Sequence, residues 1–236
     1  MKNKEKIFVN IVSNAIIVVI ILIVVLFAFS ESATNVFRPQ ESPIYNGDKN
    51  SNMVSLMFNV YQGNEEVKEI LEILNRNNLK CTFFVGGVWV KNNPEVFFGI
   101  VARGHEIGNH GYNHKNHSTL SDADDLKEIS STHELVLDLT GIKMRLFAPP
   151  SGDYDKQNLK NAASLDYATI LWSKDTIDWR DQNADLIVQR ATKNLAGGDL
   201  VLMHPTPATV DALQRIIDYC VSNGLSIVTV GQNTNI

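Results

Sequence analysis

The stretch GHEIGNHGYNH at residues 104–114 joins a short apolar strand pattern to a polar loop with two histidines four positions apart. Residues 105–108 suit a buried strand, and the glycines and asparagines that follow favour a turn. Two imidazoles at this spacing, His110 and His114, can chelate one divalent metal ion through their nitrogen atoms. The alternative is a pair of unrelated surface histidines. The stretch therefore predicts a strand whose carboxyl end carries chemically capable side chains.

Apolar, β-prone runs alternate with amphipathic helical stretches on both sides of this segment. Within residues 65–79, for example, apolar side chains follow the i, i+3, i+4, i+7 spacing of a helix with one buried face. This alternation predicts an α/β fold with a parallel sheet of about seven strands, either an open doubly wound sheet or a closed barrel. Both architectures place functional residues at the carboxyl ends of the strands. The other expected strands are 53–60, 80–85, 142–147, 167–172, 199–203 and 226–230, and further helices are expected at 94–103, 122–139, 155–165, 185–195 and 208–222.

Two later strands are followed by a histidine and an aspartate. His204 follows the strand at 199–203, and Asp178 follows the strand at 167–172. A carboxylate that holds the imidazole proton would orient His204 as a general acid or base, whereas the alternative is a buried structural histidine. Trp179, next to Asp178, could stack on the face of a sugar ring. A serine-hydrolase triad with Ser151 is disfavoured because no Gly-x-Ser-x-Gly elbow surrounds this serine.

The first thirty residues differ from the rest of the chain. Three lysines within residues 2–6 precede an apolar run over residues 7–29, which is long enough to cross a hydrocarbon core. We therefore expect residues 1–29 to form a single-pass anchor in the cell membrane with a cytoplasmic N-terminus. A polar linker at 30–52 and one extracytoplasmic domain at 53–236 would follow. The alternative is a signal peptide cleaved near residues 28–32.

Composition narrows the function classes further. The 236 residues carry a net charge of -5, which argues against a nucleic-acid partner because non-specific binding to nucleic acid needs a basic surface. Cys81 and Cys220 are too few for a disulfide framework. They either pair with each other or pack as buried thiols.

Taken together, the strand ends resemble the motifs of the polysaccharide deacetylases, the NodB-homology or carbohydrate esterase family 4 fold. The likeness covers about residues 54–230 and is closest to the sporulation-type, PdaB-like branch found in Gram-positive spore formers. It implies a distorted (β/α) barrel with fewer than eight strands. The matching segments are LMFN (56–59), CTFFV (81–85), GHEIGNH (104–110) followed by His114, FAPPSGD (147–153), DTIDW (175–179) and LMH (202–204).

The resemblance also implies a reaction, the hydrolysis of the amide C–N bond of an N-acetyl sugar. In the family, a metal ion held by one aspartate and two histidines polarises the acetyl carbonyl and binds the attacking water. A second aspartate is the general base, and a histidine protonates the leaving amine. By position, His110 and His114 match the metal histidines, with zinc or cobalt as the implied cofactor, and His204 matches the acid.

Other residues take their expected roles from the same resemblance. Asp178 matches the carboxylate that tunes the acid, and Trp179 matches a wall of the pocket. The backbone N–H of Ser151 matches the donor to the oxyanion. Tyr61 follows the first strand and is expected to contact the substrate.

The first motif departs from the family pattern. The family has Phe-Asp-Asp-Gly where this chain has FNVY at residues 58–61. Asn59 stands in the place of the base, although an amide cannot accept a proton at neutral pH, and Val60 stands in the place of the metal aspartate. Ala148 replaces the arginine that pairs with the base. Without a carboxylate at Asn59, a guanidinium at this position would be an unpaired buried charge.

Two hypotheses therefore stay open. The first is an impaired deacetylase that acts on N-acetylated cell-wall glycan, either peptidoglycan or a chitin-like polymer, close to the membrane. The second is a pseudoenzyme that binds glycan or a partner in cell-wall or spore-cortex assembly. The first hypothesis is favoured by the matches at Asp178, Trp179, His204 and the two metal histidines, His110 and His114. The second is favoured by Asn59, Val60 and Ala148.

Overall fold

The computed structural model describes residues 14–20 and 41–236 of the chain. Residues 14–20 are helical and exposed, and residues 41–236 belong to a separate compact unit. Among these described residues we find no helix with the length and hydropathy that a membrane span requires. The anchor expected within residues 7–29 lies largely outside the described residues.

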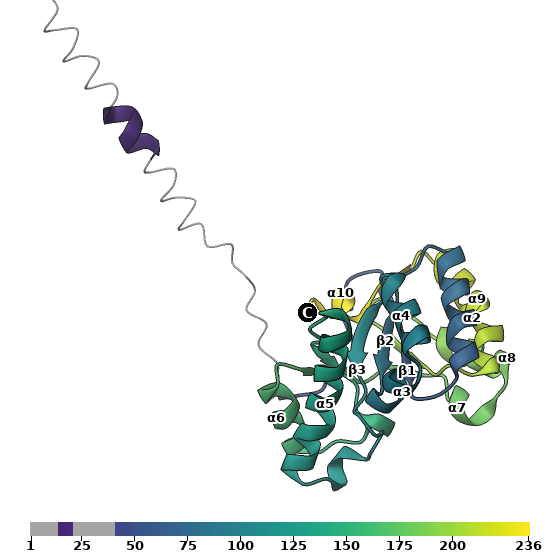
Figure 1. Cartoon of the computed structure of the whole chain (residues 1–236). Helices are drawn as coiled ribbons and strands as arrows, with labels where there is room; N and C mark the ends of the chain where they lie inside the picture. The colour runs from purple at the N-terminus through teal and green to yellow at the C-terminus, as the bar shows by residue number, and fades with distance from the viewer. Residues whose placement is uncertain (1–13, 21–40) are drawn as a thin grey trace, which may run out of the picture. The chain divides into compact units, whose positions relative to one another are not determined.

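A parallel sheet forms the centre of residues 41–236 (Figure 1). Its strand order is β5-β4-β3-β2-β1-β7-β6, and β8 pairs with the start of β1. This path is a half-barrel, which confirms the predicted α/β class and a distorted barrel of about seven parallel strands. The strands are β1 (Met53–Val60), β2 (Thr82–Val85), β3 (Glu106–Asn109), β4 (Leu146–Phe147), β5 (Ala168–Thr169), β6 (Lys174–Asp175), β7 (Leu200–Met203) and β8 (Ser226–Ile227).

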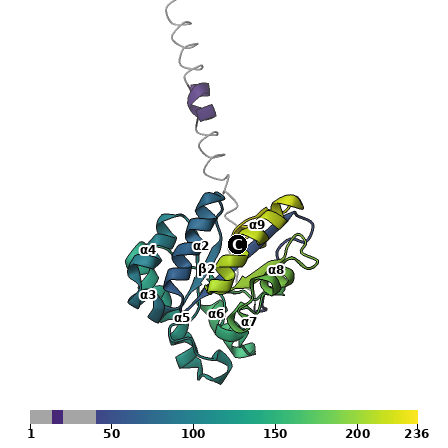
Figure 2. The same ribbon diagram turned by 90° about the vertical axis from the view of Figure 1, so that its right-hand side faces the viewer.

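Helices surround the sheet, and neighbouring helices pack on one another (Figure 2). Helix α2 packs against α4 and α9, α8 packs against α9, and α5 packs against α6. The helices are α2 (Asn64–Arg76), α3 (Gly87–Asn92), α4 (Pro94–Ala102), α5 (Asp122–Thr140), α6 (Lys156–Ser164), α7 (Asp178–Asp181), α8 (Ala184–Thr192), α9 (Pro207–Ser222) and α10 (Val230–Thr234).

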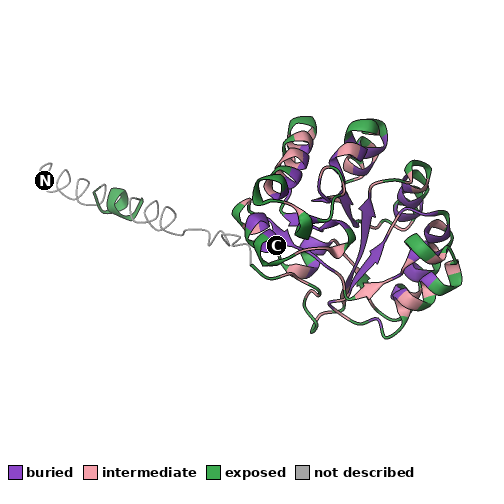
Figure 3. Ribbon diagram, turned by 90° about the horizontal axis from the view of Figure 1, so that it is seen from below, coloured by how far each residue is buried: buried purple, intermediate pink, exposed green. Residues whose placement is uncertain are grey.

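Strand β1 is the longest strand of the sheet and is buried along almost its whole length. All its residues from Val54 onward are buried, and the exposed surface of the unit lies on the outer faces of the helices (Figure 3). Met57 lies in register with Thr82 of β2 and with Leu202 of β7. The Phe58 ring stacks on a β2 phenylalanine with ring centroids 5.0 Å apart. A parallel strand covered on both faces is expected to be continuously apolar, and this one is apolar except at Ser55 and Asn59.

Short elements account for most differences from the predicted boundaries. The strands expected at 142–147 and 167–172 shrink to the two-residue strands β4 and β5. The strand expected at 226–230 ends at Ile227, because the Thr229 side chain accepts a hydrogen bond from the Gln232 N–H and caps α10. The sequence did not predict β6, α3 or α7, which are too short for a periodic pattern.

Residues 41–52, which fall within the segment expected as a linker, run along the sheet. Ile44 forms a parallel bridge with Ile170, and Asn46 forms an antiparallel bridge with Asp199. The Ile44 N–H donates to the Thr169 carbonyl at 2.9 Å. The rest of the expected linker, residues 30–40, lies outside the described residues.

Both cysteines are free thiols in the interior. Packing without a disulfide is thus the correct one of the two predicted alternatives. Burial raises the pKa of the Cys81 thiol well above its ordinary value and that of Cys220 to about 11. Since the thiolate is the reactive form, both cysteines are chemically protected.

His105 makes the domain sensitive to acid. Its ring is buried, and Nδ1 accepts a hydrogen bond from the Cys81 N–H at 3.2 Å. Burial, reinforced by the positive charges of Lys80 and Arg103, lowers the pKa of His105 to about 4. The unfolded chain, with a histidine pKa of about 6.5, therefore takes up this proton first, so stability is lost as the pH falls from about 6.5 towards 4.

We expect the free energy of unfolding in urea to decrease between about pH 7 and pH 4.5. In His105→Asn the amide oxygen still accepts from the Cys81 N–H but does not titrate, so the decrease should be smaller. An unchanged pH dependence in this variant would contradict the assignment.

Candidate functional site

The carboxyl ends of β1, β3, β6 and β7 surround one cavity of about 510 Å³. Parallel pairing brings these ends to the same edge of the sheet, as the strand-end rule predicts. The cavity is lined by Asn59, Tyr61, Gln62, His110, His114, Ser151, Trp172, Asp175, Trp179, Leu202, His204 and Pro205.

The predicted site residues come together in this cavity. Those that line it are Asn59, Tyr61, His110, His114, Ser151, Trp179 and His204. Asp178 is fully buried behind the wall, where it contacts His204. Ser151 has a left-handed backbone with φ 58°, so the loop after β4 turns sharply at the cavity rim.

Asp178 fixes the orientation of His204. The Nδ1–H of His204 donates to Asp178 Oδ1 at 2.8 Å, and the backbone N–H of His204 donates to Oδ2 at 2.6 Å. The Thr209 hydroxyl also donates to Oδ2, at 2.7 Å, and the Trp179 N–H donates to Oδ1 at 2.9 Å. The second ring nitrogen of His204, Nε2, is left for the cavity. This is the arrangement of an oriented acid–base histidine.

His110 and His114 form the facing wall. Their ring centroids are 5.0 Å apart, and the Tyr61 ring lies 4.8 Å from that of His114. The His110 Nδ1–H donates to the Ala148 carbonyl at 2.7 Å, so Nε2 carries the free lone pair. Burial, followed by the nearby His114, lowers the pKa of His110 well below its ordinary value. Burial also lowers the pKa of His114, and both imidazoles are therefore neutral at physiological pH.

Glu128 on α5 holds the loop that carries these histidines, a role that the sequence did not predict. Its Oε2 accepts the N–H groups of Tyr112 and Asn113 at 3.0 and 2.6 Å, and its Oε1 accepts from the Asn113 side chain at 2.6 Å. Asn109 Oδ1 accepts the Gly111 N–H at 2.9 Å. A lone glutamate in mid-helix gives no local signal of a contact that is made 15 residues away.

A second buried pair lies behind the same loop. His117 and Asp125 are fully buried, and Nδ1 of His117 lies 2.5 Å from Oδ1 of Asp125. Acidic residues in a first helical turn usually interact with the helix dipole. In α5, Asp125 instead ties the start of the helix to the loop after His114.

Asn59 occupies the end of β1 with an unsatisfied amide. Its side chain is 3% exposed and lines the cavity, and its Oδ1 has no hydrogen-bond partner among the described residues. Val60 is fully buried in the hydrophobic core, and Ala148 is fully buried at the end of β4. The positions that the resemblance gives to the base, a metal ligand and an arginine therefore hold an amide and two apolar side chains.

The donors present do not complete a catalytic metal site. Across residues 14–20 and 41–236, no group of three or more His, Cys, Asp or Glu side chains is placed to hold an ion. His110 and His114 supply two imidazoles, and Val60 supplies no ligand atom. Since catalytic zinc normally has three protein ligands and a water, these two histidines alone do not fit the group that the resemblance implies.

Several known proteins are similar to this chain. YlxY of Bacillus subtilis (strain 168), an uncharacterized protein, is 37% identical over 191 residues, which are 81% of this chain and 60% of YlxY. A peptidoglycan-N-acetylglucosamine deacetylase of Bacillus cereus is 32% identical over 79% of this chain and 70% of its own length. This chain thus spans less than two thirds of YlxY but more than two thirds of the deacetylase.

A crystal structure with the same fold comes from Bacillus anthracis. BA3943, described as a CE4 family pseudoenzyme, superposes with a TM-score of 0.80 at 38% identity, over 83% of this chain and 69% of its own. A BA3943 mutant described as having restored enzymatic activity superposes with the same TM-score at 36% identity, over 83% and 72% of the two chains.

The profile of the polysaccharide deacetylase family matches residues 46–170, which include β1 to β5 and the His110–His114 loop. More than half of the chain is matched in this way, and the Bacillus cereus relative is matched over 70% of its length. The chain therefore belongs to the polysaccharide deacetylase family.

Proposed function

We propose that this protein binds the glycan strands of peptidoglycan and does not hydrolyse their N-acetyl groups. The observation that carries the proposal is the end of β1, where the cavity presents the amide of Asn59 and no third metal ligand accompanies His110 and His114 among the described residues. A missing general base typically costs about 10²–10⁴ in rate, and a missing metal removes the Lewis acid as well.

The likeness to BA3943 supports this proposal, because that protein is described as a pseudoenzyme of the same family. The choice of glycan follows the Bacillus cereus relative, whose name gives peptidoglycan N-acetylglucosamine as its substrate. The cavity offers aromatic side chains on which sugars stack, namely Tyr61, Trp172 and Trp179. Membership of the PdaB-like, sporulation-type branch and a role in the spore cortex stay predictions.

A weak hydrolase is the second candidate, and one observation favours it. Asp178 and His204 keep the geometry of an oriented acid, with Nδ1 to Oδ1 at 2.8 Å and three further donors on the carboxylate. A site used only for binding does not need such an arrangement. His204 would then carry the proton transfers that Asn59 cannot.

We expect the purified full-length chain to release no acetate from N-acetylated peptidoglycan or chitin oligomers, with or without added zinc or cobalt. The variant Asn59→Asp/Val60→Asp/Ala148→Arg supplies a base, a metal ligand and a partner for the base, and we expect it to gain activity of about 10²-fold or more over background. Adding His204→Ala to this variant should abolish the gain. Because Val60 and Ala148 are buried, near-ultraviolet circular dichroism should confirm that the variant is folded. Acetate release by the unmodified chain that His204→Ala abolishes would establish the second candidate instead.

Metal content separates the two candidates independently of turnover. After zinc loading and dialysis, we expect the unmodified chain to retain well below one zinc per chain, because two imidazoles hold zinc weakly. Val60→Asp should raise retention, and His110→Ala in that background should remove it again. Stoichiometric zinc in the unmodified chain, measured by plasma mass spectrometry, would contradict the two-ligand site.

We also propose that residues 1–29 anchor the protein in the cell membrane with the domain outside. The full-length chain should remain in the membrane fraction after washing with salt and carbonate, and protease added to protoplasts should degrade the domain. A mature N-terminus near residues 28–32, read by mass spectrometry, would show a cleaved signal peptide instead.

A further inference from the structure

We propose that the cavity recognises an amino sugar with a free, protonated amine in preference to the N-acetylated sugar. This inference rests on the proposed function, since it names which form of the glycan the same cavity binds. The ligand class is a glucosamine unit within a partly deacetylated glycan strand.

The described residues that line the cavity include one carboxylate and no lysine or arginine. Among the twelve described residues that line the cavity, Asp175 is the one with a permanent charge, and none is a lysine or arginine. Asp175 Oδ1 accepts the Ile177 N–H at 2.8 Å, and its second oxygen has no hydrogen-bond partner in the described part of the chain. The nearby cation, Arg180, lies over the Trp179 ring, is paired with Asp181 at 2.7 Å and also interacts electrostatically with Asp175. The cavity therefore favours a cation.

Two acceptors of the cavity are free to bind an ammonium group. His110 presents Nε2 as a lone pair, because its Nδ1–H is used by the Ala148 carbonyl. Asn59 has an amide oxygen without a partner within residues 41–236. An ammonium group brings three N–H donors and satisfies such acceptors, whereas a neutral acetamide brings one donor and a carbonyl that needs a donor of its own. Charge-assisted hydrogen bonds are also the stronger ones.

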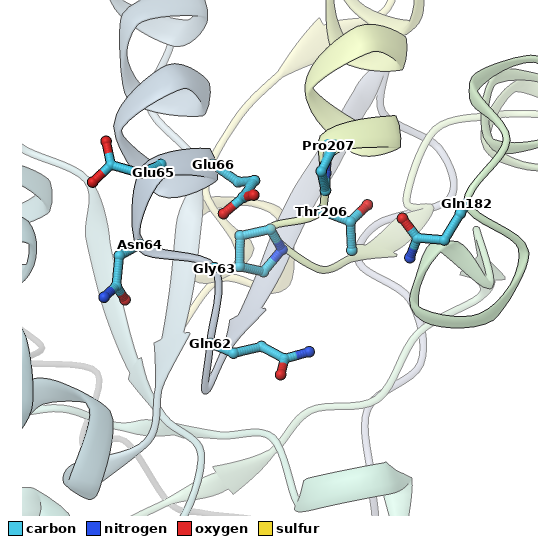
Figure 4. Close-up of a pocket in the computed structure, with 9 residues that line it drawn as sticks. Gln62, Gly63, Asn64, Glu65, Glu66, Gln182, Thr206 and Pro207 are labelled. Carbon is cyan, nitrogen blue, oxygen red and sulfur yellow. The ribbon is translucent and has the colours of Figure 1, made fainter.

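A cleft next to the cavity carries further acidic side chains (Figure 4). It has a volume of about 540 Å³ and shares the lining residues Gln62 and Pro205 with the cavity, so the two spaces lie next to each other. Its charged lining residues are Glu65 and Glu66 at the start of α2. Glu65 is paired with a lysine, whereas Glu66 makes no ion pair among the described residues. A glycan strand that leaves the cavity along this cleft would meet negative charge again. Such charge suits a run of several protonated amino sugars.

The walls suit a cationic sugar as well. Trp172 and Trp179 line the cavity, and Trp179 is 57% exposed at its mouth. Indole faces stack on sugar rings and attract cations above the ring, and one face of Trp179 already has the Arg180 guanidinium 5.9 Å from its centroid. A protonated amino sugar offers both properties in one unit.

The test compares two oligomers of equal length. Isothermal titration calorimetry of the full-length chain in detergent, at about pH 6 where amines are protonated, would use the glucosamine hexamer and the N-acetylglucosamine hexamer. We expect the glucosamine hexamer to bind about 10-fold more tightly or better. Asp175→Asn keeps the acceptor for the Ile177 N–H and removes the charge, so it should weaken binding of the glucosamine hexamer about 10-fold and leave the other hexamer unchanged.

Two further variants and a competitor complete the design. Glu66→Gln, at a half-buried position that makes no ion pair among the described residues, should weaken only the glucosamine hexamer, and circular dichroism should confirm that the variant is folded. Asp138→Asn, an exposed aspartate on α5 away from both spaces, should change neither affinity. Hexalysine should not displace the glucosamine hexamer. Equal or tighter binding of the N-acetylated hexamer, indifference to Asp175→Asn, or displacement by hexalysine would overturn the inference. Binding of the N-acetylated hexamer alone would leave the proposed function standing, whereas binding of neither hexamer would reject both.

Discussion

The carboxylate of Asp178 has no exposure to solvent and is satisfied by four donors from three segments of the chain. A buried charge is stable only when such partners are present, so the end of β7, the turn of α7 and the start of α9 must meet around it. Their meeting sets the orientation of His204 and the place of Trp179. The Gln182 side chain, which lines the adjoining cleft, also donates to the Asp178 carbonyl at 2.8 Å.

Buried hydrogen bonds also fix the opposite side of the cavity. His110 is held by the Ala148 carbonyl, and the loop after it is held by the buried Glu128. Both histidines are thus fixed next to β1, as in a metal site, but β1 ends in Asn59 and the buried Val60. Asn59 and Ala148 are physically consistent with each other, since a carboxylate or a guanidinium at either buried position would lack a partner at the other. The result is a cavity with an oriented histidine, two neutral imidazoles, aromatic walls and one carboxylate, and the proposal of glycan binding rests on these features.

The long elements of the fold were predictable, and the short ones were not. Strand β1 and helices α2, α5 and α9 carry enough residues for their periodicity to be read, and their observed boundaries lie within a few residues of the predicted ones. Strand β6 and helix α7 are two and four residues long, and pairing with β7 and the hydrogen bonds to Asp178 define them. The Thr229 cap converts the end of an expected strand into α10. Such short segments take their conformation from tertiary contacts that no local pattern encodes.

By itself, the sequence determined that the protein has a parallel α/β domain and that His110, His114, Asp178 and His204 follow its strands. Because the carboxyl ends of parallel strands share one edge of the sheet, these residues were expected to lie together. It also determined that an amide stands at Asn59. Only the tertiary structure decided that Glu128 and Asp125 support the loop from within, because their partners are held next to them by packing and not by sequence spacing. The tertiary structure alone also decided the charge of the cavity lining. Asp175 is the acidic residue among the described lining residues, and the cleft next to Gln62 adds the carboxylates of Glu65 and Glu66. The sign of a cavity depends on which side chains point into it, and that orientation is a property of the folded chain.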